Sequence, residues 1–176
     1  MTSLRNEHHN LSITDIPGIK IGHYTDFNLI TGCTVILTES GAVGSVDVRG
    51  GSPGSRETDL LHPTANVPFI HGIVLSGGSA FGLQSADGVV KYLKDRNIGH
   101  QAGNSKIPIV AGSILFDLNI GLDMPPDVDS GYKACIAATD KKPQEGTVGA
   151  GTGATVAKLM GFDHALKGGI GTYGMS

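Results

Sequence analysis

Glycine is the residue that most limits what this chain can fold into. It supplies 27 of the 176 residues, about twice its usual share of roughly 7%. Several glycines stand in pairs beside apolar runs, as Gly77 and Gly78 do shortly after the run 69–75. Glycine adopts backbone conformations that other residues avoid, and it lets other groups approach the main chain closely. The pattern therefore predicts sharp turns between buried segments.

The rest of the composition argues against a disordered, fibrous or nucleic-acid-binding protein. Hydrophobic residues make up 39% of the chain, whereas disordered segments are poor in them, and the glycines lack the three-residue period of collagen. The formal net charge is −3 with scattered Lys and Arg, so no nucleic-acid surface is predicted. No apolar run reaches the ~18 residues of a membrane span, and the polar start lacks the apolar core of a secretory signal. We therefore expect a cytoplasmic protein with no membrane partner.

The length predicts a single domain. Residues 1–12 are mostly polar and are expected to form a flexible tail, which leaves 13–176 for the folded part. Cys33 and Cys135 lie far apart in apolar surroundings without C-x-x-C spacing, so we predict two reduced, buried thiols. The seven histidines lack the spacing of metal ligands, and we predict no metal site.

Apolar runs bounded by turn residues predict the strands of the fold. The runs 33–37 and 69–75 are rich in apolar and β-branched residues and are predicted to be buried strands. The segment 42–48 alternates in polarity and is expected to pair with 33–37 as a hairpin across 39–41. The segment 168–173 is predicted to open a further strand.

Three segments show patterns expected of helices that pack on a sheet. They contain Leu83, Ala86, Val90 and Leu93 in the first, Tyr132, Cys135, Ile136 and Thr139 in the second, and residues 154–160 in the third. Strands mixed with helices, without strict alternation, predict an α/β or α+β fold with helices packed on sheet faces.

The segment 73–82 (IVLSGGSAFG) is typical of a strand, a tight turn and the start of a helix. Backbone N–H groups at a helix start bind anions or the oxyanion of a reaction intermediate, so Gly77, Gly78 and Ser79 form a candidate site. A structural interpretation is equally consistent, with the glycines making the turn and Ser79 capping the helix. The G-x-S-x-G pattern of α/β-hydrolase nucleophiles is not matched, because Phe81 stands two residues after the serine.

Two other segments are candidates for chemistry. The stretch 149–154 contains G-x-G-x-x-A, but it lacks the preceding strand and the later acidic residue of a dinucleotide-binding motif. The loop from Arg49 to Asp59, which includes Arg56, is the densest polar cluster. It is either a loop held by ion pairs or a loop at the mouth of a site on a rigid scaffold. These residues alone do not identify a reaction.

Four motifs in order resemble the L-aminopeptidase/D-esterase family, self-processing peptidases that include the β-peptidyl aminopeptidases. The motifs are VDVRGGSPGSRETDLL, IVLSGGSAFGL, IPIVAGSILFDLN and EGTVGAGTGATVAKLMG. The resemblance implies the αββα sandwich that these enzymes share with ornithine acetyltransferases. It also implies a precursor that cuts itself ahead of a Ser or Thr, which becomes the nucleophile with its own α-amine as the base.

The resemblance places that cleavage site and nucleophile beyond the point that matches Ser176. Residues 13–176 are therefore expected to be the N-terminal (α-chain) part of one self-processing hydrolase domain. This part would be an incomplete sandwich without the catalytic nucleophile, inactive alone, and its partner would be the complementary C-terminal (β) chain. The resemblance also implies a homo-oligomer with no cofactor and no metal.

The β-peptidase branch of the family carries a Glu-x-Tyr motif, whose Glu is associated with the substrate amine and whose Tyr is associated with the oxyanion. The matching positions here are Gly112, Ser113 and Ile114, so neither function is preserved. Asp117 is the nearest carboxylate. It is expected either to pair with a substrate ammonium or to cap the end of a strand.

Together these features predict a substrate pocket formed by Gly77–Ser79, Asp117 and Asn119, with Arg49 and Arg56 near it. The expected function is an aminopeptidase that acts on small peptides, amino-acid amides or esters with a free amino group. Two alternatives stay open: a non-catalytic binding or scaffold homologue, and an acyltransferase related to ornithine acetyltransferase.

Overall fold

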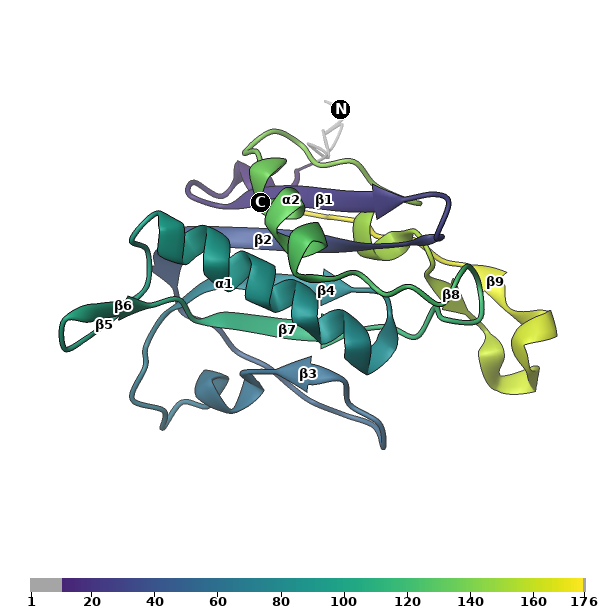
Figure 1. The fold of residues 1–176 in the computed structure, drawn as a ribbon, viewed down its shortest axis with the longest axis horizontal. Coiled ribbons are helices and arrows are strands. Elements are labelled where there is room, and N and C mark those ends of the chain that lie inside the picture. The colour runs from purple at the N-terminus through teal and green to yellow at the C-terminus, as the bar shows by residue number, and fades with distance from the viewer. Residues whose placement is uncertain (1–10, 176) are drawn as a thin grey trace, which may run out of the picture.

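The computed structural model of the chain describes residues 11–175 and shows a five-stranded sheet in the order β1-β2-β4-β7-β3 (Figure 1). Its strands are β1 (Lys20–Asp26), β2 (Thr31–Ala42), β3 (Ser55–Arg56), β4 (Ile70–Ser76) and β7 (Val110–Ile114). β4 and β7 are parallel, and the other neighbouring pairs are antiparallel. The carboxyl ends of β4 and β7 therefore lie at the same edge of the sheet.

Residues 11–175 also contain two hairpins and six 3₁₀ turns. The hairpins are β5 (His100–Ala102) with β6 (Ser105–Ile107) and β8 (Thr155–Val156) with β9 (Leu166–Lys167). The 3₁₀ turns are η1 (Ile13–Asp15), η2 (Thr58–Leu61), η3 (Ser79–Gln84), η4 (Gly149–Gly151), η5 (Lys158–Met160) and η6 (Phe162–His164). Within the described chain, no helix is long and apolar enough to cross a membrane.

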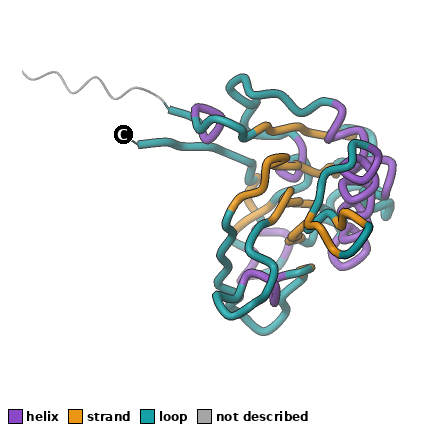
Figure 2. Tube along the Cα trace, turned by 90° about the vertical axis from the view of Figure 1, so that its left-hand side faces the viewer, coloured by secondary structure: helices purple, strands orange, loops and turns teal. Residues whose placement is uncertain are grey.

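Helices α1 (Ser85–Asp95) and α2 (Val128–Ile136) pack against each other on one face of the sheet (Figures 1 and 2). Their close contact depends on Gly88 and Gly131. A Cβ atom on either glycine would collide with a main-chain carbonyl of the other helix. Glycine is therefore required here for close approach of two backbones, the use that its abundance predicts.

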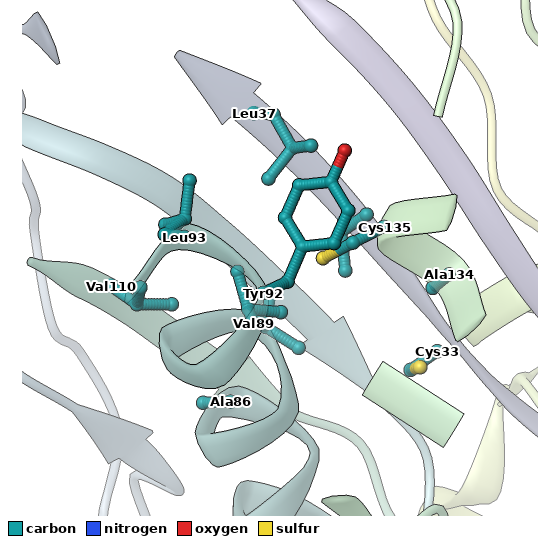
Figure 3. Close-up of a cluster of buried hydrophobic side chains, with 11 residues drawn as sticks. Cys33, Leu37, Ala86, Val89, Tyr92, Leu93, Val110, Ala134 and Cys135 are labelled. Carbon is teal, nitrogen blue, oxygen red and sulfur yellow. The ribbon is translucent and has the colours of Figure 1, made fainter. Parts of the chain in front are cut away.

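The core lies between these helices and the sheet (Figure 3). It consists of the buried side chains of Cys33, Val35, Leu37, Val74, Ala86, Val89, Tyr92, Leu93, Val110, Ala134 and Cys135. Both thiols are free and buried, as predicted. Burial raises the pKa of each thiol to about 12, so both are protonated at neutral pH.

In the described residues no α-helix covers the opposite face of the sheet, where the short 3₁₀ turn η4 packs against β1 and β2. Ile36, Ile73 and Leu75 alternate with core residues of β2 and β4, and their side chains are half-buried on this face. Figure 2 shows the two ends of the described chain on the side away from the helices, where Leu11 forms a bridge with Gly174. This open face therefore carries an apolar surface that is only partly covered.

Most of the predicted elements are present, and the α/β fold class is confirmed. The run 33–37 lies in β2, and most of the run 69–75 lies in β4. The first two helical patterns lie mainly in α1 and α2, although Leu83 belongs to η3 and Thr139 follows α2. In α1 the core contains Val89 in place of the expected Val90, which packs against the core from outside. Residues 1–10 of the predicted tail lie outside the described residues, whereas 11–12 lie inside them.

The predicted hairpin between 33–37 and 42–48 is wrong. β2 pairs with β1 along one edge and with β4 along the other, so neither edge is free for a third strand. Residues 43–48 leave the sheet and form no strand. The alternation of apolar and polar residues is a local pattern, whereas the pairing of β2 is decided by β1, which precedes it in the chain, and by β4, which follows it.

The predicted helix over 154–160 is also wrong. Thr155–Val156 pairs with β9, and Ala157 then adopts a left-handed conformation with φ 61°, which no α-helix contains. The segment 168–173, predicted to open a strand, forms only a single bridge, between Gly146 and Ile170.

Candidate functional site

The candidate site lies beyond the carboxyl ends of the parallel strands β4 and β7, where open α/β sheets bind their ligands. A cavity of about 240 Å³ is present there. Its lining comes from the ends of both strands and from the two glycine-rich segments near 151 and 169, and it consists of Leu75, Ser76, Ser113, Ile114, Leu115, Ala150, Gly151, Ala154, Gly169 and Ile170. The lining contains no ionisable side chain, so the cavity is suited to a neutral, largely apolar group.

Asp117 lies in the segment that follows β7, two residues after Leu115 of the cavity lining, and it is only 3% exposed. The Thr31 hydroxyl donates to Asp117 Oδ2 over 2.8 Å, and the Gly78 N–H donates to Asp117 Oδ1 over 2.6 Å. A Cβ atom on Gly77 or on Gly153 would collide with Oδ2. One buried carboxylate therefore holds together the start of β2, the turn after β4 and the loop that ends at residue 153.

The backbone is strained on both sides of this carboxylate. Ser79 and Ile30 both have φ 53°, a left-handed conformation that non-glycine residues adopt only at a cost of order 1–3 kcal/mol. Ile30 directly precedes Thr31, and Ser79 directly follows Gly78, so each strained residue adjoins a donor to Asp117. The Ser79 N–H also donates to Leu115 O over 3.0 Å, which helps to hold the turn in this conformation.

The backbone amides of the turn 77–79 are all used inside the chain. The N–H groups of Gly77 and Ser79 donate to Gly32 O over 2.9 Å and to Leu115 O over 3.0 Å, and Gly78 donates to Asp117. The expectation that this turn presents free N–H groups is therefore wrong for these three residues. Ser79 is not a cap either, because the residue in the cap position is Gly78 and no side chain caps this turn.

The second glycine-rich loop, 149–153, is also fixed by side chains of the sheet. The Gly149 N–H donates to Thr25 Oγ1 over 2.8 Å, and the Ala150 N–H donates to Thr34 Oγ1 over 3.0 Å. His23 Nδ1 lies 2.9 Å from the same Thr34 Oγ1, and burial lowers the pKa of His23. This threonine–histidine contact resembles a nucleophile with its base, but Thr34 is buried and its oxygen holds the loop.

The other predicted site residues are dispersed. Asn119 is exposed in the turn after β7. Arg49 is exposed and forms an ion pair with Asp47 over 2.7 Å; it lines a separate cavity of about 370 Å³ that shares Ser113 and Ile114 with the first. Arg56 forms an ion pair over 2.6 Å with an aspartate of α1, Asp87, on the side of the sheet that carries the helices.

The structure thus brings together Gly77, Gly78 and Asp117, and it adds two residues that the sequence analysis did not select, Thr31 and Gly153. Thr31 carried no signal, because it lies 86 residues before Asp117. Gly153 lies inside the G-x-G-x-x-A segment. The glycine pattern there indicates that another group approaches the backbone closely, but it does not identify that group.

The fold is a variant of the N-terminal nucleophile (Ntn) hydrolase fold. The chain superposes on the L-aminopeptidase D-Ala-esterase/amidase of Ochrobactrum anthropi with a TM-score of 0.67 and 18% identity, covering 81% of this chain and 44% of that one. It superposes on a Burkholderia sp. beta-aminopeptidase with a TM-score of 0.65 and 21% identity, covering 87% and 45%. The described residues supply one sheet and one helical layer of this αββα architecture.

The chain belongs to peptidase family S58, whose model matches residues 11–175. An uncharacterized aminopeptidase of Mycobacterium leprae is 46% identical over 173 residues, which are 92% of this chain and 47% of that protein. A 6-aminohexanoate-oligomer endohydrolase of Paenarthrobacter ureafaciens is 32% identical over 148 residues, 82% of this chain and 39% of that enzyme. The chain therefore spans less than half the length of these relatives.

Proposed function

We propose that this chain is the N-terminal part of an aminopeptidase whose Ser or Thr nucleophile comes from a segment C-terminal to Ser176. The observation that carries the proposal is the position of the neutral cavity at the ends of β4 and β7. Its lining includes Leu75 of the open face, the face on which the second sheet of an αββα sandwich packs. A second segment that covered this face would place its own residues against the cavity.

In this proposal the segment that covers the open face is the complementary C-terminal (β) chain, released when the precursor cuts itself. The freed Ser or Thr hydroxyl gives its proton to the base, attacks the carbonyl carbon of the substrate and forms an ester. The amine, or the alcohol of an ester substrate, leaves with the proton that the base returns. Water then hydrolyses the ester and regenerates the hydroxyl. The substrates are small peptides, amino-acid amides or esters.

The role of the described residues is to shape the pocket for the acyl part of the substrate. Leu75, Ile114 and Ile170 provide apolar walls, and Ser113 adds a hydroxyl. Asp117 was expected either to pair with the substrate ammonium or to cap the end of a strand, and it is buried with both of its oxygens accepting hydrogen bonds inside the chain. The group that recognises the free amine is therefore expected in the C-terminal part.

The test is to express the whole gene product and examine it by denaturing gel, intact mass and N-terminal sequencing. We expect two fragments, the smaller of which begins with Ser or Thr. Purified protein is then assayed on amino-acid p-nitroanilides with free and with N-acetylated amines, and only the free-amine substrates should be cleaved. A single uncut chain without activity on either substrate would reject the proposal. Gel filtration of the same sample tests the expected homo-oligomer.

A second candidate function is the hydrolysis of internal amide bonds, as named for the Paenarthrobacter ureafaciens relative. The observation that favours it is that no ionisable side chain lines the cavity, so a chain segment without a terminal ammonium also fits. The same preparation is tested on an N-acetylated oligomer of 6-aminohexanoate. Cleavage of this oligomer together with the acetylated p-nitroanilide would favour the endohydrolase over the aminopeptidase.

A further inference from the structure

We propose that Asp117 is a positioning residue that fixes the two glycine loops beside the cavity, and that it does not bind the substrate. The role in catalysis rests on the proposed function, whereas the role in holding the loops can be tested without any activity. Asp117 lies in the segment after β7, and the loops are residues 77–79 and 149–153.

The bonding of the carboxylate supports a positioning role. Asp117 is 3% exposed, and each of its two oxygens accepts one short hydrogen bond, from Gly78 N–H at 2.6 Å and from Thr31 Oγ1 at 2.8 Å. A carboxylate oxygen can accept more than one hydrogen bond, so burial is what separates Asp117 from a substrate ammonium. An ammonium that reached these oxygens would have to give up its hydration inside the folded chain, which is strongly unfavourable.

The packing around the carboxylate points to the same role. Gly77 and Gly153 come from the two different loops, and a side chain at either position would collide with Oδ2. Both glycines are therefore required for the loops to approach the carboxylate from two sides. Asp117 sets the distance between the loops by direct contact with each.

The position of the turn is transmitted to the cavity through the backbone of one residue. The Leu115 N–H donates to Ser76 O over 2.9 Å, and Leu115 O accepts from the Ser79 N–H over 3.0 Å. Leu115 itself lines the cavity. A shift of the strained turn at Ser79 would therefore displace a wall of the cavity without removing any side chain that contacts a substrate.

The conservative variant separates positioning from binding of an ammonium. The Oδ1 of an Asn side chain still accepts the Gly78 N–H, and its amide group can donate to Thr31 Oγ1. An Asn at position 117 therefore preserves the geometry and removes the charge. If Asp117 instead paired with the substrate ammonium, its negative charge would be required. Asp117→Asn and Asp117→Ala would then weaken substrate binding to a similar extent.

The experiment compares Asp117→Asn, Asp117→Ala and Thr31→Val in the full-length protein, with Asp163→Asn as the control for the loss of an exposed carboxylate. Amide hydrogen exchange is measured on peptides that cover the turn 77–84. Because hydrogen bonds to charged groups contribute ~1.5–3 kcal/mol, we expect Asp117→Ala to accelerate exchange about 10- to 100-fold. We expect an intermediate effect for Thr31→Val and little change for Asp117→Asn and the control.

In kinetics on a free-amine p-nitroanilide, Asp117→Ala should lower kcat by about 10-fold or more with little change in KM, and Asp117→Asn should restore most of kcat. An increase in KM shared by both variants would overturn the proposal in favour of ammonium binding. Unchanged exchange in Asp117→Ala would overturn it independently of catalysis. If Asp117→Ala does not fold, unchanged exchange in Thr31→Val overturns it. An inactive wild-type protein would reject the proposed function, and the exchange data would still decide the structural role.

Discussion

Replacing Gly77 with Ala tests how firmly Asp117 fixes the turn after β4. Gly77 does not occupy a left-handed conformation, so alanine is compatible with its backbone. On backbone grounds alone the change stabilises the protein by ~0.4–1 kcal/mol, because alanine restricts the unfolded chain. A methyl group there would however collide with Asp117 Oδ2 and Thr31 Oγ1, which belong to two buried residues. The two effects have opposite signs, and their magnitudes decide the outcome.

The collision is relieved only if the carboxylate or the hydroxyl moves, which breaks the 2.8 Å bond between them. A hydrogen bond to a charged group contributes ~1.5–3 kcal/mol, and subtracting the backbone gain leaves a loss of about 0.5–2.6 kcal/mol in the free energy of unfolding. In a chain of this size such a loss lowers Tm by ~1–10 °C.

Urea unfolding of the full-length protein measures this loss as a lower midpoint at constant slope. Gly51→Ala is the matched control, because nothing lies within 4 Å of a Cβ atom built on Gly51. In an Asp117→Ala background the cost of Gly77→Ala should fall, since one of its two obstacles is absent. The reasoning is refuted if Gly77→Ala is as stable as Gly51→Ala, or if its cost is unchanged in the double variant.

Three further predictions concern the second glycine loop, the pH dependence and the sheet edge. Thr34→Val leaves the buried N–H of Ala150 without its acceptor and should lower the free energy of unfolding by about 1–3 kcal/mol; wild-type stability in urea would contradict this. Burial lowers the pKa of His23, so the unfolded state takes up the proton first as the pH falls. The contribution of the neutral His23 to stability is complete above about pH 6.5 and is lost as the pH falls below it. Urea midpoints between about pH 5 and pH 8 should therefore depend less on pH in His23→Gln than in the wild type. The Arg56–Asp87 ion pair is partly exposed, so Arg56→Ala should lower the free energy of unfolding by at most ~1 kcal/mol, and by less in high salt. A loss above about 2 kcal/mol would contradict this small contribution of an exposed pair.

The sequence predicts those parts of the fold that depend on local periodicity. The apolar spacing that forms α1 and the run that forms β4 are visible within short windows, because one face of each element packs in the core. The segment 42–48 shows the limit of this reasoning. Its alternation is real, but whether it joins a sheet depends on which strand edges are free, and β1 and β4 occupy both edges of its predicted partner.

The candidate site shows the same limit at the level of single residues. A carboxylate just after an apolar run has the same sequence signature whether it binds a ligand or holds a turn. What distinguishes the roles is the burial of the carboxylate and the hydrogen bonds that its oxygens already accept, and one of the two bonds at Asp117 comes from Thr31, 86 residues away. The glycines at 77 and 153 predicted close approaches, but the group that they approach belongs to a third segment.

The two glycine loops have a shared construction that constrains how an enzyme of this kind would stabilise its reaction. In each loop, N–H groups that a glycine turn could offer to a ligand are bonded to side chains: Gly78 to Asp117, Gly149 to Thr25 and Ala150 to Thr34. Glycine is used here for close packing, and its amides cannot contact a substrate without displacing a protein acceptor. Donors that stabilise a developing oxyanion must be preorganised and unoccupied. In the proposed aminopeptidase these donors therefore have to come from groups other than these three amides, with the C-terminal segment that supplies the nucleophile as their expected source.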